Sequence, residues 1–168
     1  MGMQSMEIKK AALEDIPEIV KVYDIARMFM RANGNLSQWG GGYPGEALLR
    51  GDIQAGNLYI LCADGAMEGV FAFIPGEDPT YRYIEDGSWH WNRPYGTIHR
   101  LASRGTARGV AKACFDFCRE KIPYLRIDTH ADNHPMQNAV LHYGFRKCGT
   151  IYLADGSPRI AFDYMQGK

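Results

Sequence analysis

The stretch from Ile98 to Phe145 restricts the fold of this chain more than any other part of it. It begins with an apolar strand at Ile98–Ser103, continues with a loop of small residues and two arginines at Arg104–Ala111, and enters a helix at Lys112–Glu120. A second strand and a second helix then follow, at Tyr124–Thr129 and Asn133–Tyr143. The first N–H groups of a helix are unpaired and carry partial positive charge, so this strand, loop and helix predict a site for a phosphorylated ligand.

Hydrophobic periodicity places further elements on both sides of this stretch. They are a strand at Glu7–Ala11, helices at Ile16–Ala32 and Glu46–Gln54, a hairpin of Leu58–Ala63 and Met67–Ile74, and a closing hairpin of Arg146–Leu153 and Arg159–Met165. The segment from Pro75 to Pro94 has no regular pattern and is polar and aromatic. This order predicts an α/β (α+β) fold, in which about four helices flank a mixed, mostly antiparallel central sheet of about seven strands.

Length and charge limit the organisation and the partners. With 168 residues, we expect a leader or remnant at residues 1–5 and a single domain at 6–168. The formal net charge of +0 argues against a nucleic-acid surface, and the chain lacks the run of roughly 20 apolar residues that spans a bilayer. The sequence leaves open whether the protein forms a homodimer.

The cysteines and histidines indicate a chain without a metal. The four cysteines follow no metal-ligand spacing, which favours a reducing, cytoplasmic setting. His130 and His134 are four residues apart, but Pro135 implies a turn between them, so we expect no metal site there.

The chain resembles GNAT-type N-acetyltransferases from about Met6 to Met165. Gly109-Val110-Ala111 is similar to the end of the family's pyrophosphate loop, and Ile127-Asp128-Thr129, Asn133 and Gly144-Phe145 are similar to its second signature. The resemblance implies a GNAT-like fold that transfers an acetyl group from acetyl-CoA to a primary amine of a small molecule or peptide, by direct attack in a ternary complex.

The resemblance also implies which residues contact the co-substrate, acetyl-CoA or CoA. They are Leu101, Ala102, Ser103, Arg104, Thr106, Ala107, Arg108, Gly109, Val110, Ala111, Asn133, Met136 and Val140. The family's loop arginine or glutamine falls on Thr106 in one register and on Arg104 in another; the first keeps the following helix in step. In either register, Arg104 and Arg108 are candidates for the phosphate contact.

The catalytic groups are less clearly marked. Many family members place a proton-donating tyrosine seven residues after the asparagine, where this chain has Val140, so Tyr143 becomes the candidate acid and core packing its alternative. His99 is the candidate base, because imidazole titrates near neutral pH, and strand alternation places it opposite Ile98 and Arg100. The backbone N–H of Leu101 or Ala102 is the candidate that polarises the thioester carbonyl.

The irregular segments are candidates for binding the acceptor. The substrate-binding candidates are Trp39, Tyr43, Tyr81, Glu85 and Trp89. Aromatic rings beside carboxylates favour a cationic amine. An alternative function is an acyl-CoA-binding module with weak or lost catalysis, in a regulatory or assembly role, which the valine at position 140 supports.

Overall fold

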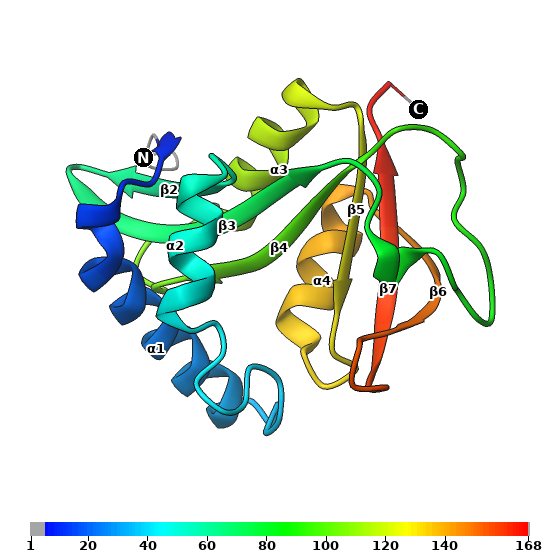
Figure 1. Ribbon diagram of the computed structural model, residues 1–168, viewed down its shortest axis with the longest axis horizontal. Helices are drawn as coiled ribbons and strands as arrows, with labels where there is room; N and C mark the ends of the chain where they lie inside the picture. Colours follow the sequence, from blue (N-terminus) through cyan, green and yellow to red (C-terminus); the bar gives the residue numbers. More distant parts are fainter. Residues whose placement is uncertain (1–5, 168) are drawn as a thin grey trace. The chain divides into compact units, whose positions relative to one another are not determined.

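The computed structural model describes residues 6–167. The elements in chain order are β1 (Glu7–Lys10), α1 (Ile16–Ala32), α2 (Glu46–Gln54), β2 (Leu58–Ala63), β3 (Ala66–Pro75), β4 (Gly96–Ser103), α3 (Val110–Lys121), β5 (Tyr124–Thr129), α4 (His134–Tyr143), β6 (Arg146–Tyr152) and β7 (Pro158–Met165) (Figure 1). Short 3₁₀ turns, η1 (Leu13–Asp15) and η2 (Pro79–Tyr81), were not expected from the sequence.

Within these residues the strands form one seven-stranded sheet in the order β1-β2-β3-β4-β5-β7-β6. The β4–β5 pair is parallel, and the β1–β2, β2–β3, β5–β7 and β6–β7 pairs are antiparallel. The predicted α/β fold with a mostly antiparallel sheet is therefore confirmed. None of the helices described is long and apolar enough to cross a membrane.

Contacts within the described chain group into two compact units. The first contains the residues up to Phe73 together with Arg100–Phe117, and the second contains Ile74–His99 and the residues from Cys118 onward. The chain passes from the second unit to the first within β4, between His99 and Arg100. The single domain expected at 6–168 stays a prediction, and the expected leader at 1–5 lies outside the described residues.

The first unit buries apolar side chains on both faces of its strands. Successive side chains of a strand point to opposite faces, so Leu58 and Ile60 of β2 share one core cluster with residues of α1 and α2. Tyr59, on the other face, stacks on Phe71 of β3 and meets the ring of Phe117 of α3 edge-on. Helices therefore cover both faces here, and each fully buried leucine or isoleucine contributes about 1.5–3 kcal/mol.

The second unit holds the irregular segment between β3 and β4 against β5, β6 and β7. Tyr81 and Tyr95 from this segment are buried in a core cluster with Tyr124 of β5. The fully buried carboxylate of Asp163 on β7 accepts hydrogen bonds from the His90 backbone (2.9 Å), the His90 ring (2.7 Å) and the Tyr124 hydroxyl (2.7 Å). Tyr81 and Tyr95 of this segment are therefore part of the packed core, whereas most of its other residues are exposed or half-buried.

Strand β4 is not regular along its length. Its parallel pairing with β5 covers Gly96 and Thr97. Arg100 then adopts a φ of 55°, in the left-handed region that side-chain-bearing residues rarely occupy. The regular alternation that the sequence predicts through His99 and Arg100 is wrong at this point, because one left-handed residue changes the direction in which the following side chains point.

Candidate active site

The predicted phosphate loop lies in the first unit, between β4 and α3. Gly109 has a φ of 80° and is the last residue before α3, whose first turn is closed by a hydrogen bond from the Ala113 N–H to the Gly109 carbonyl (2.9 Å). Helix α3 begins two residues earlier than predicted, so Val110 and Ala111, which were expected in the loop, belong to the first turn of the helix. The first N–H groups of α3 lack partners within the helix and are oriented to bind an anion.

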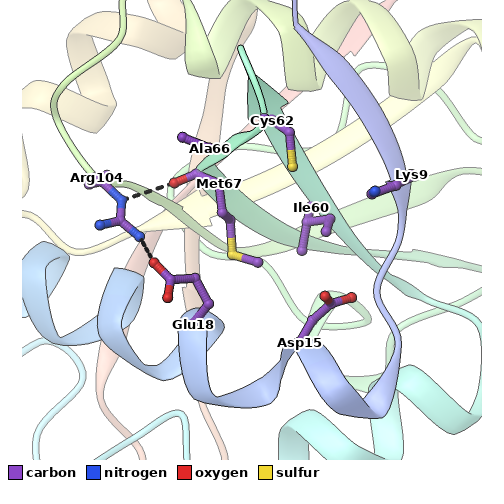
Figure 2. A pocket seen from close by; sticks show the side chains of 9 residues that line it. Lys9, Asp15, Glu18, Ile60, Cys62, Ala66, Met67 and Arg104 are labelled. Carbon is purple, nitrogen blue, oxygen red and sulfur yellow. Dashed lines mark hydrogen bonds and ion pairs between the residues drawn. The ribbon is translucent and has the colours of Figure 1, made fainter.

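Arg104 anchors this loop to neighbouring elements. Its Nε donates to the Met67 carbonyl (2.9 Å), and its guanidinium forms an ion pair with the Glu18 carboxylate (Figure 2). Its backbone N–H donates to the Glu68 carbonyl (2.8 Å), and the Thr106 hydroxyl donates to the Glu68 carboxylate. The guanidinium of Arg104 is thus engaged by protein groups, whereas Arg108 is exposed.

Arg104 also lines an open pocket of about 360 Å³. The pocket wall includes Lys9, Asp15, Glu18, Cys62 and Met67, from β1, η1, α1, β2 and β3 (Figure 2). Two carboxylates and two cations give this wall mixed charge. It therefore lacks the positive potential that a phosphate group needs.

His99 forms an acid–base pair in the second unit. Its Nε2 lies 3.1 Å from Oδ2 of Asp78, a carboxylate that also accepts the Thr80 backbone N–H (2.9 Å). The hydrogen bond from His99, helped by that of Thr80, lowers the pKa of Asp78 against the opposing effect of partial burial. A charged Asp78 can accept the Nε2–H of His99, and in that tautomer the Nδ1 lone pair is the one that accepts a proton.

A second carboxyl, that of Asp128 on β5, belongs to the same group of residues. Its Oδ2 accepts the Tyr81 hydroxyl at 2.5 Å, and the Tyr81 ring centroid lies 6.5 Å from that of His99. Burial raises the pKa of Asp128, and the positive charge of His99 in its protonated form and the hydrogen bond from Tyr81 partly offset this effect. Burial also raises the pKa of Tyr81, so its hydroxyl stays protonated and donates.

Asp78 and Asp128 were not among the site residues expected from the sequence. Asp78 precedes Pro79 and caps η2, which is a turn signal in the sequence, but nothing local connects it to a histidine 21 positions later. Asp128 lies within the strand motif Ile127-Asp128-Thr129, where its role depends on which residues lie beside it.

The candidate acid Tyr143 lies in an aromatic cluster. Its ring packs 6.0 Å from that of Phe145 and 5.2 Å from that of Tyr164, and the Arg119 guanidinium lies 5.7 Å from its centroid. These contacts fit the packing alternative, and a catalytic role for Tyr143 stays a prediction.

Helix α4 carries the remaining residues expected to contact CoA. The Asn133 side chain accepts the Met136 N–H at 3.1 Å and so caps the helix. Val140 is fully buried. Contacts of Asn133, Met136 and Val140 with CoA stay predictions.

The predicted substrate-binding residues divide between the two units. In the first unit, Trp39 packs edge-on against Tyr23, and the hydroxyl of the exposed Tyr43 accepts a hydrogen bond from Arg100 at 3.2 Å. In the second unit, the Trp89 indole donates to the Tyr81 carbonyl at 3.0 Å, so these two residues support each other beside His99.

Glu85 forms hydrogen bonds with a separate pair of tyrosines in the second unit. It accepts the hydroxyls of Tyr83 (2.5 Å) and Tyr152 (2.6 Å), and these two bonds lower its pKa. Its backbone also bridges to Thr150 of β6. A bound ligand would therefore compete with two hydroxyls for this carboxylate.

One group of potential metal ligands comes together within residues 6–167. His90, Cys148 and Asp163 place one ligand atom each within 4.8 Å of one another. Burial raises the pKa of the Cys148 thiol and keeps it protonated, and the carboxylate of Asp163 already accepts three hydrogen bonds. The contacts are those of a saturated hydrogen-bond network that fixes His90 to β6 and β7.

Comparisons with solved structures identify the family of the chain. Neither a family model nor a curated protein sequence matches the chain. Among solved structures, a GNAT-family acetyltransferase from Streptococcus agalactiae is 31% identical, with 99% of each chain covered and a TM-score of 0.89. A GNAT-family acetyltransferase from Listeria monocytogenes is 16% identical, with 98% of each chain covered and a TM-score of 0.71.

A Salmonella typhimurium protein whose structure holds its cofactor acetyl-CoA is 11% identical, covers 97% of this chain and 95% of its own, and has a TM-score of 0.63. The two similarities below 25% identity show that the fold is shared. The similarity to the Streptococcus protein extends over almost the whole of both chains at 31% identity. The chain therefore belongs to the GNAT family of acetyltransferases.

Proposed function

We propose that this protein transfers the acetyl group of acetyl-CoA to a primary amine of a small molecule or peptide, by direct attack in a ternary complex. The observation that carries the proposal is the pair that His99 of β4 forms with Asp78, the residue that caps η2. Such a pair supplies the base that amine acetylation needs.

The support for acetyl-CoA comes from the loop before α3 and from the family. The unpaired N–H groups at the start of α3 and the exposed Arg108 suit a pyrophosphate, while Arg104 holds the loop in place. The acetyl-CoA in the Salmonella structure is consistent with this assignment.

The proposed reaction needs a base and a hydrogen-bond donor. His99 takes a proton from the amine, whose nitrogen attacks the thioester carbonyl carbon, and a backbone N–H stabilises the developing negative charge on oxygen. The carbon–sulfur bond then breaks, and the CoA thiolate leaves. The nitrogen then loses its second proton, and the thiolate takes up a proton directly or through water, since a thiol has a pKa not far above neutrality.

We further propose that the acceptor is cationic before it reacts. Asp78 and Asp128 lie beside His99, and the half-buried Trp89 provides an aromatic ring next to Tyr81. Two carboxylates and an aromatic ring attract an ammonium group by charge and by cation–π interaction.

The test measures thiol release from acetyl-CoA against a panel of primary amines that includes diamines, peptide N-termini and neutral amino-acid amides. Release that depends on an amine, with diamines preferred, supports the proposal. Binding of CoA by calorimetry without any release would instead favour the acyl-CoA-binding module. Absence of both binding and release would reject the acetyl-CoA assignment.

A further inference from the structure

The strained residue of β4 is held by three elements of the first unit. The Tyr23 hydroxyl of α1 donates to the Arg100 carbonyl at 2.8 Å. The Arg100 guanidinium donates to Asp52 of α2 at 2.5 Å and to the Tyr43 hydroxyl, from the α1–α2 loop, at 3.2 Å. Left-handed backbone in an arginine persists only where the surroundings impose it, and these hydrogen bonds do so.

The contacts of Arg100 with Tyr23 and Asp52 are largely buried, whereas that with Tyr43 is exposed. The Tyr23 side chain is 1% exposed, and those of Arg100 and Asp52 are 8% and 11% exposed. Burial raises the pKa of Tyr23, so its hydroxyl remains a donor throughout the working range of pH. Burying an ion pair and a hydroxyl costs free energy of desolvation. This cost argues that the groups around the strained Arg100 peptide have a role beyond filling space.

The direction of the Leu101 N–H follows from two independent observations. In a trans peptide the N–H points opposite to the preceding carbonyl, so the Tyr23–Arg100 bond directs the Leu101 N–H away from Tyr23. The Arg104 N–H donates to Glu68 of β3, and N–H groups of successive strand residues alternate in direction. The Ala102 N–H therefore faces β3, and the Leu101 N–H points away from it.

We propose that Tyr23 is a positioning residue for acetyl transfer, with Asp52 as its support. The Tyr23 hydroxyl orients the Arg100–Leu101 peptide, so that the Leu101 N–H polarises the thioester carbonyl, and the Asp52–Arg100 ion pair keeps that peptide from relaxing. This inference rests on the proposed function, and it selects Leu101 over Ala102 as the donor.

The test compares Tyr23→Phe with wild type by infrared spectroscopy of bound acetyl-CoA labelled with ¹³C at the thioester carbonyl. In wild type we expect the carbonyl stretch to lie below its value in free acetyl-CoA, and in Tyr23→Phe to return toward that value. We expect kcat to fall about tenfold in the variant, less than deletion of an oxyanion donor costs. The dissociation constant for acetyl-CoA should stay within about twofold, because ground-state binding is retained.

Tyr124→Phe is the matched control, since it also removes a buried tyrosine hydroxyl that donates a hydrogen bond, here to Asp163. It should lower the melting temperature while the carbonyl stretch and kcat stay at wild-type values. If Tyr23→Phe does not fold, Asp52→Asn keeps the size and an acceptor oxygen but weakens the hold on Arg100, and it should shift the stretch in the same direction.

A carbonyl stretch and kcat in Tyr23→Phe indistinguishable from wild type would overturn the positioning role, as would a wild-type stretch equal to that of free acetyl-CoA. Failure of the wild-type protein to bind acetyl-CoA at all is a different result, because it rejects the proposed function itself.

Discussion

The two carboxyl groups beside His99 have pKa shifts of opposite sign. The hydrogen bond from His99 lowers the pKa of Asp78, whereas burial raises that of Asp128. A group whose pKa is lower in the folded protein stabilises the fold at pH values above its pKa in the unfolded chain. This stability is lost as pH falls through the pKa of the group in the folded protein. A group whose pKa is higher in the folded protein contributes its full stability at pH values below its pKa in the unfolded chain. This stability is lost as pH rises through the pKa of the group in the folded protein.

These signs predict opposite effects for two aspartate-to-asparagine variants. Asp128→Asn removes a partly desolvated charge and keeps an acceptor for Tyr81, so it should be more stable than wild type at pH 7, with the difference disappearing near pH 3. Asp78→Asn should be less stable than wild type at pH 7, again converging at low pH. Urea denaturation at several pH values measures both, and equal signs at pH 7 would contradict the assignment of the two carboxyl groups.

The role of His99 predicts a pH-dependent loss of activity. His99→Gln should reduce kcat/KM about 100-fold near pH 7, within the range for loss of a general base. The deficit should shrink as pH rises, because more of the amine is then neutral without help from the enzyme. His142→Gln, at an exposed position of α4, is the matched control and should keep the wild-type profile. A deficit that is constant across pH would remove His99 from the role of base.

At the scale of elements, the loop before α3 depends on the conformation of Gly109. Its φ of 80° is in the region that favours glycine, and the residue directly precedes the N–H groups expected to bind phosphate. Any side chain there is strained, and a carboxylate would in addition repel an anion.

Gly109→Glu should therefore abolish measurable CoA binding in calorimetry. Gly156→Glu provides the control, because it places the same side chain at a similar φ of 87° in the β6–β7 turn. Both variants lose stability through backbone strain, and only the first should lose CoA. Wild-type affinity in Gly109→Glu would show that the phosphate groups bind elsewhere.

The sequence predicted strands and helices correctly where their periodicity and turn residues are local signals. The bounds of α2, β2 and β5 agree with those read from periodicity and turn residues, since a helical or strand period requires only neighbouring residues. The left-handed conformation of Arg100 was not predicted, because arginine has no preference for it and three distant side chains hold it there.

At the scale of the whole molecule, tight packing limits substitutions where three elements meet. A Cβ at Gly69 of β3 would lie 2.7 Å from Cγ1 of Val110 on α3 and 2.9 Å from the Ala102 carbonyl of β4. Neither distance is tolerated without movement, so this glycine sets how closely α3 and β4 approach β3.

Gly69→Ala should destabilise the protein by about 1–3 kcal/mol, as overpacking of a core does. Gly51→Ala in α2, where a Cβ would meet no heavy atom of the described residues within 4 Å, should instead stabilise it by about 0.5–1 kcal/mol. Chemical denaturation measures both values. An equal response of the two variants would mean that the close approach at Gly69 is relaxed in solution.

The amino-acid sequence by itself determined the order of helices and strands, the position of the loop before α3 and the family resemblance, since each depends on residues that are near in the chain. Only the tertiary structure decided that Arg104 pairs with Glu18 and that Asp78, Tyr81 and Asp128 gather around His99. It also decided that Tyr23 and Asp52 hold the peptide that follows Arg100. The physical reason is that hydrogen bonds and desolvation act over a few ångströms in space, and the residues that they connect here are 21 to 86 positions apart in the chain.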